Sequence, residues 1–245
     1  KGEPRAQIAL GTLKTLWVTT GTLCNITCEN CYIESSPQND RLVYLSRAEV
    51  DLFLDEVGTQ HHATEEIGIT GGEPFMNPDI LPIMQSCLAR GFKLLVLTNA
   101  MRPMMRPRIQ AGLLDLKKQF AEQLTLRVSI DHFDPALHEE ERGRGSWSAM
   151  IRGIRWLQRN GFAFHVAGRT RWGDSEGDLR QGYARGFDEL NIRLDTENPQ
   201  ALVLFPEIDV RAEVPEITTA CWGILGVDAS DMMCASSRRV VKRKG

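Results

Sequence analysis

Short apolar runs alternate with helical patterns between residues 15 and 206, and this alternation restricts the fold more than any other feature of the sequence. The run 92–98 is almost wholly apolar, as is typical of a strand buried on both faces of a parallel sheet. Strands that alternate with helices of about 10–15 residues form right-handed βαβ units. The pattern predicts strands at 16–20, 66–70, 92–98, 124–130, 162–167 and 201–205, and helices near 50–57, 80–88, 107–120, 150–157 and 175–187.

Six such units are fewer than the eight of a closed (β/α)8 barrel, so the predicted fold class is α/β, a partial (β/α)6 barrel with a short C-terminal extension. Residues 1–14 are expected to form an N-terminal lead-in and residues 15–206 the barrel. Because the alternation stops after Pro206, residues 207–245 are expected to form a separate C-terminal region.

Composition argues against several classes of partner. The 245 residues include 42% hydrophobic and 25% charged residues, as in ordinary globular domains. A formal net charge of −3 gives no reason to expect a nucleic acid. There is no apolar run of about 18 residues and no signal-peptide pattern. A cytoplasmic protein without a nucleic-acid or membrane partner is therefore predicted.

Three cysteines follow the first predicted strand in the pattern Cys24-x-x-x-Cys28-x-x-Cys31. In a parallel barrel, the loops after the strands form the face that carries active sites. Three thiolates can ligate three irons of a cubane cluster and leave the fourth iron open to a ligand. The alternative is a zinc site, which needs a fourth ligand such as His61 or His62.

Polar residues also follow the next three strands. The tetrapeptide Gly71-Gly72-Glu73-Pro74 ends the second strand, where glycines allow close backbone approach and a carboxylate can accept from an ammonium group. Thr98 and Asn99 end the third strand. Ser129 and Asp131 end the fourth, and strand alternation places them on one side. Taken singly, each of these residues is more often a turn or a strand-end cap.

Together, the cysteine motif and the Gly-Gly-Glu-Pro segment resemble those of the radical S-adenosylmethionine (SAM) superfamily. The resemblance implies a [4Fe–4S] cluster on Cys24, Cys28 and Cys31, with SAM bound to the open iron. It also implies reductive cleavage of SAM to a 5′-deoxyadenosyl radical, which abstracts hydrogen from a substrate. The electron would come from a reductant such as flavodoxin or ferredoxin.

The resemblance further implies a SAM site. Its predicted residues are Gly71, Gly72, Glu73, Pro74, Thr98, Asn99, Ser129, Asp131, Arg169 and Tyr32. Glu73 and its neighbours would bind the SAM amino group, and Ser129 and Asp131 would reach the ribose. Arg169, at the end of the fifth strand, would hold the carboxylate. The family usually has an aromatic residue just before the last cysteine, whereas this chain has Asn30 there and Tyr32 just after.

Cys234 is followed by a basic run and then by Gly245. This arrangement resembles the start of a SPASM or Twitch domain, in which the basic, β-prone run would be the first arm of a hairpin that turns at the glycine. A second cysteine would follow the glycine. The resemblance implies that Cys234 ligates an auxiliary iron–sulfur cluster in a longer chain. The alternative is a buried thiol beside a solvated basic strand. Cys87, in an apolar helical stripe, is predicted to be a core residue, and Cys221 a buried free thiol.

The substrate is predicted to be a peptide, because enzymes with such C-terminal extensions often modify peptides; a small-molecule metabolite is the alternative. An iron–sulfur electron carrier and a zinc-binding module are alternatives from other classes. The loop 101–108 contains three methionines and three arginines after the third strand. It is interpreted as a solvated connection, with a contact to an acidic substrate group as the alternative.

Overall fold

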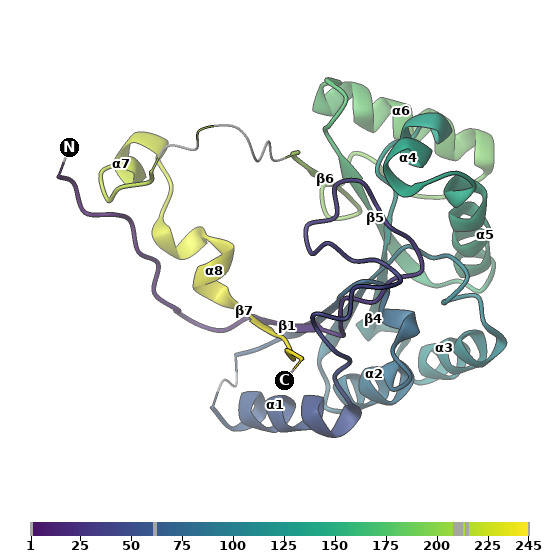
Figure 1. Cartoon of the computed structure of the whole chain (residues 1–245), viewed down its shortest axis with the longest axis horizontal. Coiled ribbons are helices and arrows are strands. Elements are labelled where there is room, and N and C mark those ends of the chain that lie inside the picture. The colour runs from purple at the N-terminus through teal and green to yellow at the C-terminus, as the bar shows by residue number, and fades with distance from the viewer. Residues whose placement is uncertain (1, 61–62, 208–212, 214–215, 245) are drawn as a thin grey trace.

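The computed structural model describes residues 2–60, 63–207, 213 and 216–244 and contains one sheet of seven parallel strands (Figure 1). The strand order is β6-β5-β4-β3-β2-β1-β7. The strands are β1 (Thr15–Thr19), β2 (Glu66–Thr70), β3 (Lys93–Thr98), β4 (Leu124–Ser129), β5 (Ala163–Arg169), β6 (Leu202–Phe205) and β7 (Ser237–Val240). The six predicted strands are therefore present, and the predicted class, an α/β partial barrel, is confirmed.

Six helices cover the outer face of the curled sheet (Figure 1). They are α1 (Arg47–Gln60), α2 (Ile80–Ala89), α3 (Pro107–Phe120), α4 (Pro135–Arg142), α5 (Ser146–Arg159) and α6 (Glu176–Leu190). Smaller pieces are the 3₁₀ helices η1 (Pro74–Met76), η2 (Ala121–Gln123) and η3 (Ala229–Asp231), and the short helices α7 (Cys221–Leu225) and α8 (Met233–Ser236). No helix in the described ranges is both long and apolar enough to cross a membrane.

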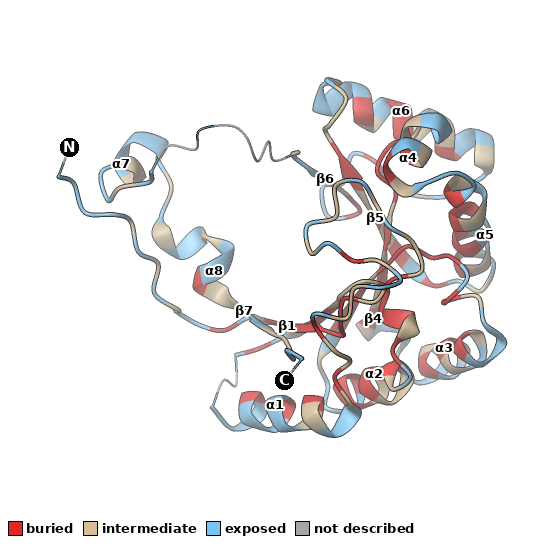
Figure 2. Ribbon diagram, viewed as in Figure 1, coloured by how far each residue is buried: buried red, intermediate tan, exposed pale blue. Residues whose placement is uncertain are grey.

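The hydrophobic core fills the space between the sheet and these helices, as the buried strands and inner helix faces in Figure 2 show. Along β4, Leu126 and Val128 point outward into this core and are fully buried. Each such side chain contributes about 1.5–3 kcal/mol to folding. Arg127 and Ser129 alternate with them and face the concave side, where they are half-buried. The concave side is thus left free for polar chemistry.

The segment after β6 returns to the opposite edge of the sheet. There β7 pairs in parallel with β1, with Thr15 opposite Ser237 and Val18 opposite Val240. Lys242 also forms a salt bridge of 2.6 Å with Glu49 at the start of α1. The basic run thus contains the expected strand, and its described partner is β1. Gly245 lies outside the described residues, so the hairpin stays a prediction.

Candidate active site

A cavity of about 820 Å³ opens on the concave side of the sheet, at the carboxyl ends of its strands. Its wall includes residues from every strand, from the cysteine loop and from α8. Most of the predicted site residues line it, namely Cys24, Cys28, Cys31, Tyr32, Gly71, Gly72, Thr98, Asn99, Ser129, Asp131, Arg169 and Cys234. Glu73 and Pro74 are not part of the wall. The topology therefore brings together motifs that lie far apart in the sequence.

The cysteine loop is fixed by hydrogen bonds to the segment that follows it. Cys24 N donates to Ser36 O at 3.1 Å, and Ser35 N donates to Cys31 Sγ at 3.2 Å. Burial raises the pKa of the Cys24 thiol to about 12. Burial also raises the pKa of Cys28, although the nearby Arg142 guanidinium acts in the opposite direction. Two of the three thiols thus lie in surroundings that disfavour a free thiolate without a cation.

The three thiols fit an iron–sulfur cluster better than a single metal ion. In the described part of the chain, no three His, Cys, Asp or Glu side chains converge as ligands of one ion. A cubane cluster takes one thiolate per iron, so its ligands surround the cluster instead of meeting at one point. Thiolates are also the donors that iron–sulfur clusters select. His61 and His62, the predicted alternative zinc ligands, lie outside the described residues.

Gly71 and Gly72 pack directly against the cysteine loop. Gly71 has a φ of +147°, and a Cβ there would lie 2.7 Å from Gly21 O. A Cβ on Gly72 would lie 2.2 Å from Leu23 O. Gly72 N also donates to Gly21 O at 2.9 Å, so the two loops share backbone hydrogen bonds. Only glycine permits this approach, and the pair therefore allows this loop to pack closely against the cysteine loop.

Gly72→Ala is expected to lower the free energy of unfolding by about 1–3 kcal/mol, because the new methyl group must displace the backbone before Cys24. Thermal unfolding followed by circular dichroism would measure the change. Gly58→Ala is the matched control, since a Cβ there meets nothing within 4 Å and alanine favours the helix. Equal melting temperatures for Gly72→Ala and wild type would contradict the close packing.

The Glu73 carboxylate lies beside the cavity wall and joins the ends of β2 and β3. It is 1% exposed and accepts hydrogen bonds from Thr98 Oγ1 at 2.9 Å, Asn99 N at 2.9 Å and Phe75 N at 3.2 Å. Burial raises its pKa to about 7, against the effect of these hydrogen bonds. A direct contact with an ammonium group was expected. In this structure the carboxylate has three protein donors, and Pro74 is buried next to it in η1. The contact with an ammonium group stays a prediction.

Asn99 connects this group to the cysteine loop. Its side-chain Nδ2 donates to Asn25 Oδ1 at 3.0 Å, and its Oδ1 accepts from Met101 N at 3.0 Å. Glu73 thus holds both Thr98 and Asn99, and Asn25 of the cysteine loop holds Asn99 from the other side. Both residues lie on the cavity wall.

Ser129 and Asp131 face the same cavity, as strand alternation predicts. Asp131 is 2% exposed and accepts from Nε and Nη2 of Arg142 and from Arg169 Nε at 3.1 Å. Burial alone would raise the pKa of Asp131. The charges of Arg142 and Arg169 outweigh that effect, and its pKa is lowered.

Arg169 is held by more groups than the sequence suggested. Its Nη2 donates to Asn30 O at 3.0 Å, and its Nη1 donates to Glu207 Oε2 at 3.1 Å. Its guanidinium also lies 4.9 Å from the centre of the Tyr32 ring, within the range of a cation–π contact. Each guanidinium nitrogen of Arg169 therefore already has a protein partner, and Tyr32 is positioned beside it at the cavity mouth.

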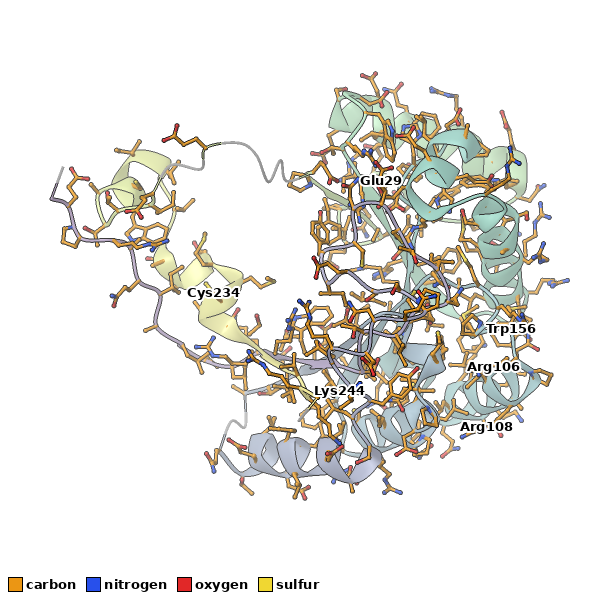
Figure 3. The ribbon with its side chains drawn as sticks, in the orientation of Figure 1. Glu29, Arg106, Arg108, Trp156, Cys234 and Lys244 are labelled. Atoms are coloured by element: carbon orange, nitrogen blue, oxygen red, sulfur yellow. The ribbon has the colours of Figure 1, made fainter. Side chains whose placement is uncertain are left out.

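A second cluster of charges was missed by the sequence analysis. The buried carboxylate of Glu141 accepts from Asn30 N at 2.8 Å, Asn30 Nδ2 at 3.0 Å and Arg171 Nη1 at 2.6 Å. Glu29, labelled in Figure 3, donates its N–H to Glu141 O at 2.9 Å. Asn30 thus ties the cysteine loop to α4. Its departure from the usual aromatic residue was the only sequence signal for this clamp.

The remaining cysteines differ in position. Cys234 is exposed on the short helix α8, where Figure 3 labels it, and it lies on the cavity wall. Cys87 is fully buried in α2, as predicted. Cys221, predicted to be a buried thiol, is only half-buried, because α7 packs few residues over it.

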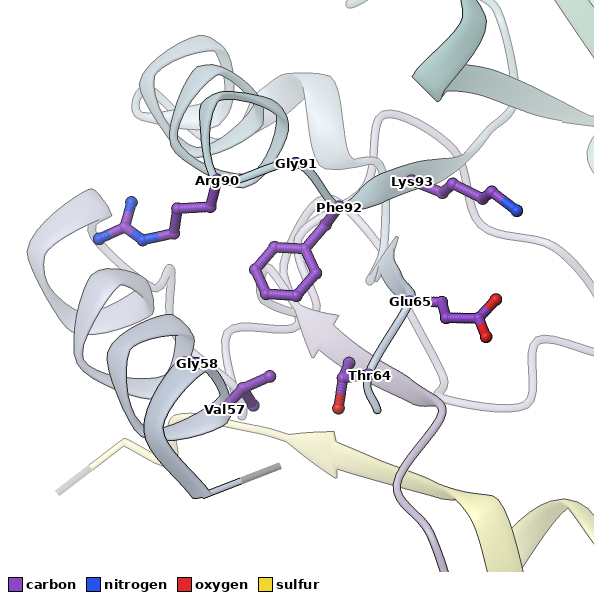
Figure 4. A pocket seen from close by; sticks show the side chains of 8 residues that line it. All are labelled: Val57, Gly58, Thr64, Glu65, Arg90, Gly91, Phe92 and Lys93. Atoms are coloured by element: carbon purple, nitrogen blue, oxygen red, sulfur yellow. The ribbon is translucent and has the colours of Figure 1, made fainter. Parts of the chain in front are cut away.

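Two other features lie away from the cavity. In the loop 101–108, Arg106 donates to Phe75 O and Arg108 to Pro78 O, which agrees with a structural connection (Figure 3). A cavity of about 440 Å³ lies at the amino ends of β2 and β3 and is lined by Arg90, Phe92 and Lys93 among others (Figure 4). That end of a barrel usually serves stability, and the described residues of the cavity wall include no cysteine or histidine.

Comparison with known proteins gives several matches. The family model described as Radical SAM superfamily matches residues 18–170. The subtilosin biosynthesis protein AlbA of Bacillus subtilis is 29% identical over 59% of this chain and 30% of its own length. An S-adenosylmethionine-dependent nucleotide dehydratase of Selenomonas ruminantium is 29% identical over 46% of this chain and 37% of its own length. The chain thus spans about a third of these curated relatives.

The fold also matches a solved structure. Streptococcus suis SuiB bound to S-adenosylmethionine aligns over 95% of this chain and 51% of its own, with a TM-score of 0.64 and 15% identity. This likeness concerns the fold alone. The family match, in contrast, covers more than half of the chain, from β1 to the end of β5, and includes all three cysteines of the loop. The chain therefore belongs to the radical SAM enzyme superfamily.

Proposed function

We propose that this chain is the catalytic core of a radical SAM enzyme that modifies a peptide. The observation that carries the proposal is the convergence of Cys24, Cys28 and Cys31 with Ser129 and Asp131 on one cavity. The family implies a [4Fe–4S] cluster and SAM as cofactors. When bound, these cofactors supply hydrogen abstraction from the substrate.

The three cysteines would hold the cluster, with one thiolate for each of three irons. The backbone at Gly71 and Gly72 would contact SAM, because both residues lie on the cavity wall. Ser129 and Asp131 would hydrogen-bond the ribose. Glu73 would act as a positioning residue, since its carboxylate fixes Thr98 and Asn99 on the wall.

Arg169 and Tyr32 would form the carboxylate side of the SAM site. A bidentate pair with SAM would require Arg169 to exchange one of its partners, and Glu207 is the most exposed of its carboxylate partners. Tyr32 would cover the site from the mouth, because its ring already lies against the Arg169 guanidinium.

A peptide substrate is supported by the cavity mouth and by a relative. Three large side chains on the cavity wall are exposed, namely Tyr32 at 58%, Phe205 at 42% and Met233 at 74%. An apolar rim of this kind suits a substrate larger than the cavity. AlbA is named for the biosynthesis of a bacteriocin. A small-molecule substrate is the second candidate, because another relative of equal identity is named for a nucleotide.

Anaerobically reconstituted protein with a strong reductant is expected to cleave SAM to methionine and 5′-deoxyadenosine in equal amounts. Chromatography of the products would measure the reaction, and Cys28→Ala protein would provide the blank. An electron carrier would show a reducible cluster without these products, and a zinc-binding module would show no visible absorbance. Either result would refute the proposed function.

The assignment of Cys234 to an auxiliary cluster stays a prediction. Cys234 lies on the wall of the same cavity as the three-cysteine loop and is exposed. A single thiol cannot hold a cluster, so the prediction requires further cysteines from outside this sequence.

A further inference from the structure

Arg127 is a cation without a partner on the concave face of the sheet. It lies on β4 two residues before Ser129, which places it roughly 7 Å deeper along the strand. It lines the same cavity as the cysteines. No residue in the described ranges makes a hydrogen bond or a salt bridge with its guanidinium, and its Nε is fully buried.

Two other arginines on the cavity wall and one beside it differ in this respect. Arg142 and Arg169 both pair with Asp131. Arg171, just outside the wall, pairs with Glu141. Burial lowers the pKa of Arg127, and the charge of Glu66, at the start of β2, acts in the opposite direction. An arginine keeps its proton even so. The fold therefore holds a partly desolvated positive charge that its own residues do not neutralise.

The surroundings of Arg127 offer further donors. His165 lies directly opposite it on β5, and its Nδ1 is buried without a partner. Arg238 and Arg239 of β7 line the same cavity from the other edge of the sheet. Since Asp131 is already taken by two guanidinium groups, the wall near Arg127 has a surplus of positive charge.

We propose that Arg127 binds a carboxylate of the substrate, presented by an Asp or Glu side chain of a peptide. This inference rests on the proposed function and specifies its substrate class. A guanidinium forms two parallel hydrogen bonds with a carboxylate, and His165 is placed to donate a third. A carboxylate at that depth would hold the adjacent carbon atoms below Ser129 and Asp131, next to the proposed SAM site.

Isothermal titration of the reconstituted protein in the presence of SAM would test this site with two tripeptides, Ac-Ala-Glu-Ala-NH₂ and Ac-Ala-Gln-Ala-NH₂. Wild-type protein is expected to bind the Glu peptide at least about tenfold more tightly, because the Gln peptide carries no charge. Arg127→Gln should remove this preference, and Arg127→Lys should keep part of it. Arg155→Gln is the matched control, since Arg155 is exposed on the outer helix α5.

Competition with glutarate, a small dicarboxylic acid, is a second experiment on the same site. If glutarate competes with the Glu peptide and binds more tightly, the carboxylate site stands, but its ligand is a small organic acid.

Thermal unfolding separates this role from a structural one. Arg127→Met is expected to melt at or above the wild-type temperature, because it removes an unpaired buried charge. A lower melting temperature would make Arg127 a structural residue and overturn the inference. So would equal affinities of wild-type protein for the Glu and Gln peptides. If that wild-type protein still cleaves SAM, only the inference fails, whereas absence of SAM cleavage refutes the proposed function.

Discussion

Single replacement of Cys24, Cys28 or Cys31 by alanine is expected to abolish the visible absorbance of the reconstituted protein. The iron content should fall from about four irons per chain to near zero, because a cubane with two protein thiolates loses a second ligand position to solvent. The three cysteines lie in one loop, in which Cys24 N donates to Ser36 O and Ser35 N donates to Cys31 Sγ. Iron analysis and absorbance spectra of the anaerobic protein measure this effect.

Two other cysteines serve as controls for this experiment. Cys221→Ala should keep a full cluster, because Cys221 is not part of the cavity wall. Cys234→Ala should also keep it, since Cys234 belongs to α8 and not to the loop. If all three loop variants retain full iron and absorbance, the cluster assignment is wrong. Loss of the cluster in Cys221→Ala would instead indicate a general failure of folding.

The strands β1 to β6 could be predicted from the sequence because each is a short apolar run between helical patterns. β7 was not predicted to join the sheet. Its four residues, Ser237–Val240, include two exposed arginines and carry no apolar alternation. Its partner β1 lies more than 200 residues away in the sequence, and no local pattern specifies such pairing. Edge strands are often charged, which is the physical reason that this one resembles a solvated segment.

The helix α4 was also not predicted, although it has a readable start. Asp134 accepts hydrogen bonds from Ala136 N and Leu137 N, and Pro135 occupies the first helical position. Both are typical N-terminal signals. Four of its eight residues, 139–142, are charged, so hydrophobic periodicity alone does not reveal this helix. The helix α4 contributes to the candidate site, because it carries Glu141 and Arg142.

Some residues of the candidate site could likewise be predicted from the sequence, and others could not. Cysteine and glycine motifs could be predicted because their spacing is local and each lies at the end of a predicted strand. The clamp between Asn30 and Glu141 joins residues 111 positions apart, and only the folded chain brings them together. The inward position of Glu73 was likewise invisible in the sequence, since it depends on donors from Thr98 and Asn99 on the next strand.

Asp131→Ala is expected to lower the free energy of unfolding by about 3–5 kcal/mol, because it leaves Arg142 and Arg169 close together without their shared carboxylate. It should also weaken SAM binding by about ten- to a hundredfold if Asp131 holds the ribose. Denaturant unfolding measures the first effect and equilibrium dialysis of SAM the second. Asp115→Ala is the matched control, because its exposed salt bridge with Lys118 is worth less than about 1 kcal/mol.

The pH dependence of the Asp131→Ala effect provides an independent check. The pKa of Asp131 is lowered below its ordinary value of 3.8 in the folded protein. Its ionised form therefore stabilises the fold fully above that ordinary value, and the contribution is lost as the pH falls through the lower, folded-state pKa. The difference in unfolding free energy between wild type and Asp131→Ala should accordingly be constant near neutral pH and shrink in acid. If the difference is small at neutral pH, or if it grows in acid, Asp131 does not anchor the two arginines. In that case the loss of SAM binding in Asp131→Ala could be assigned to a direct contact alone.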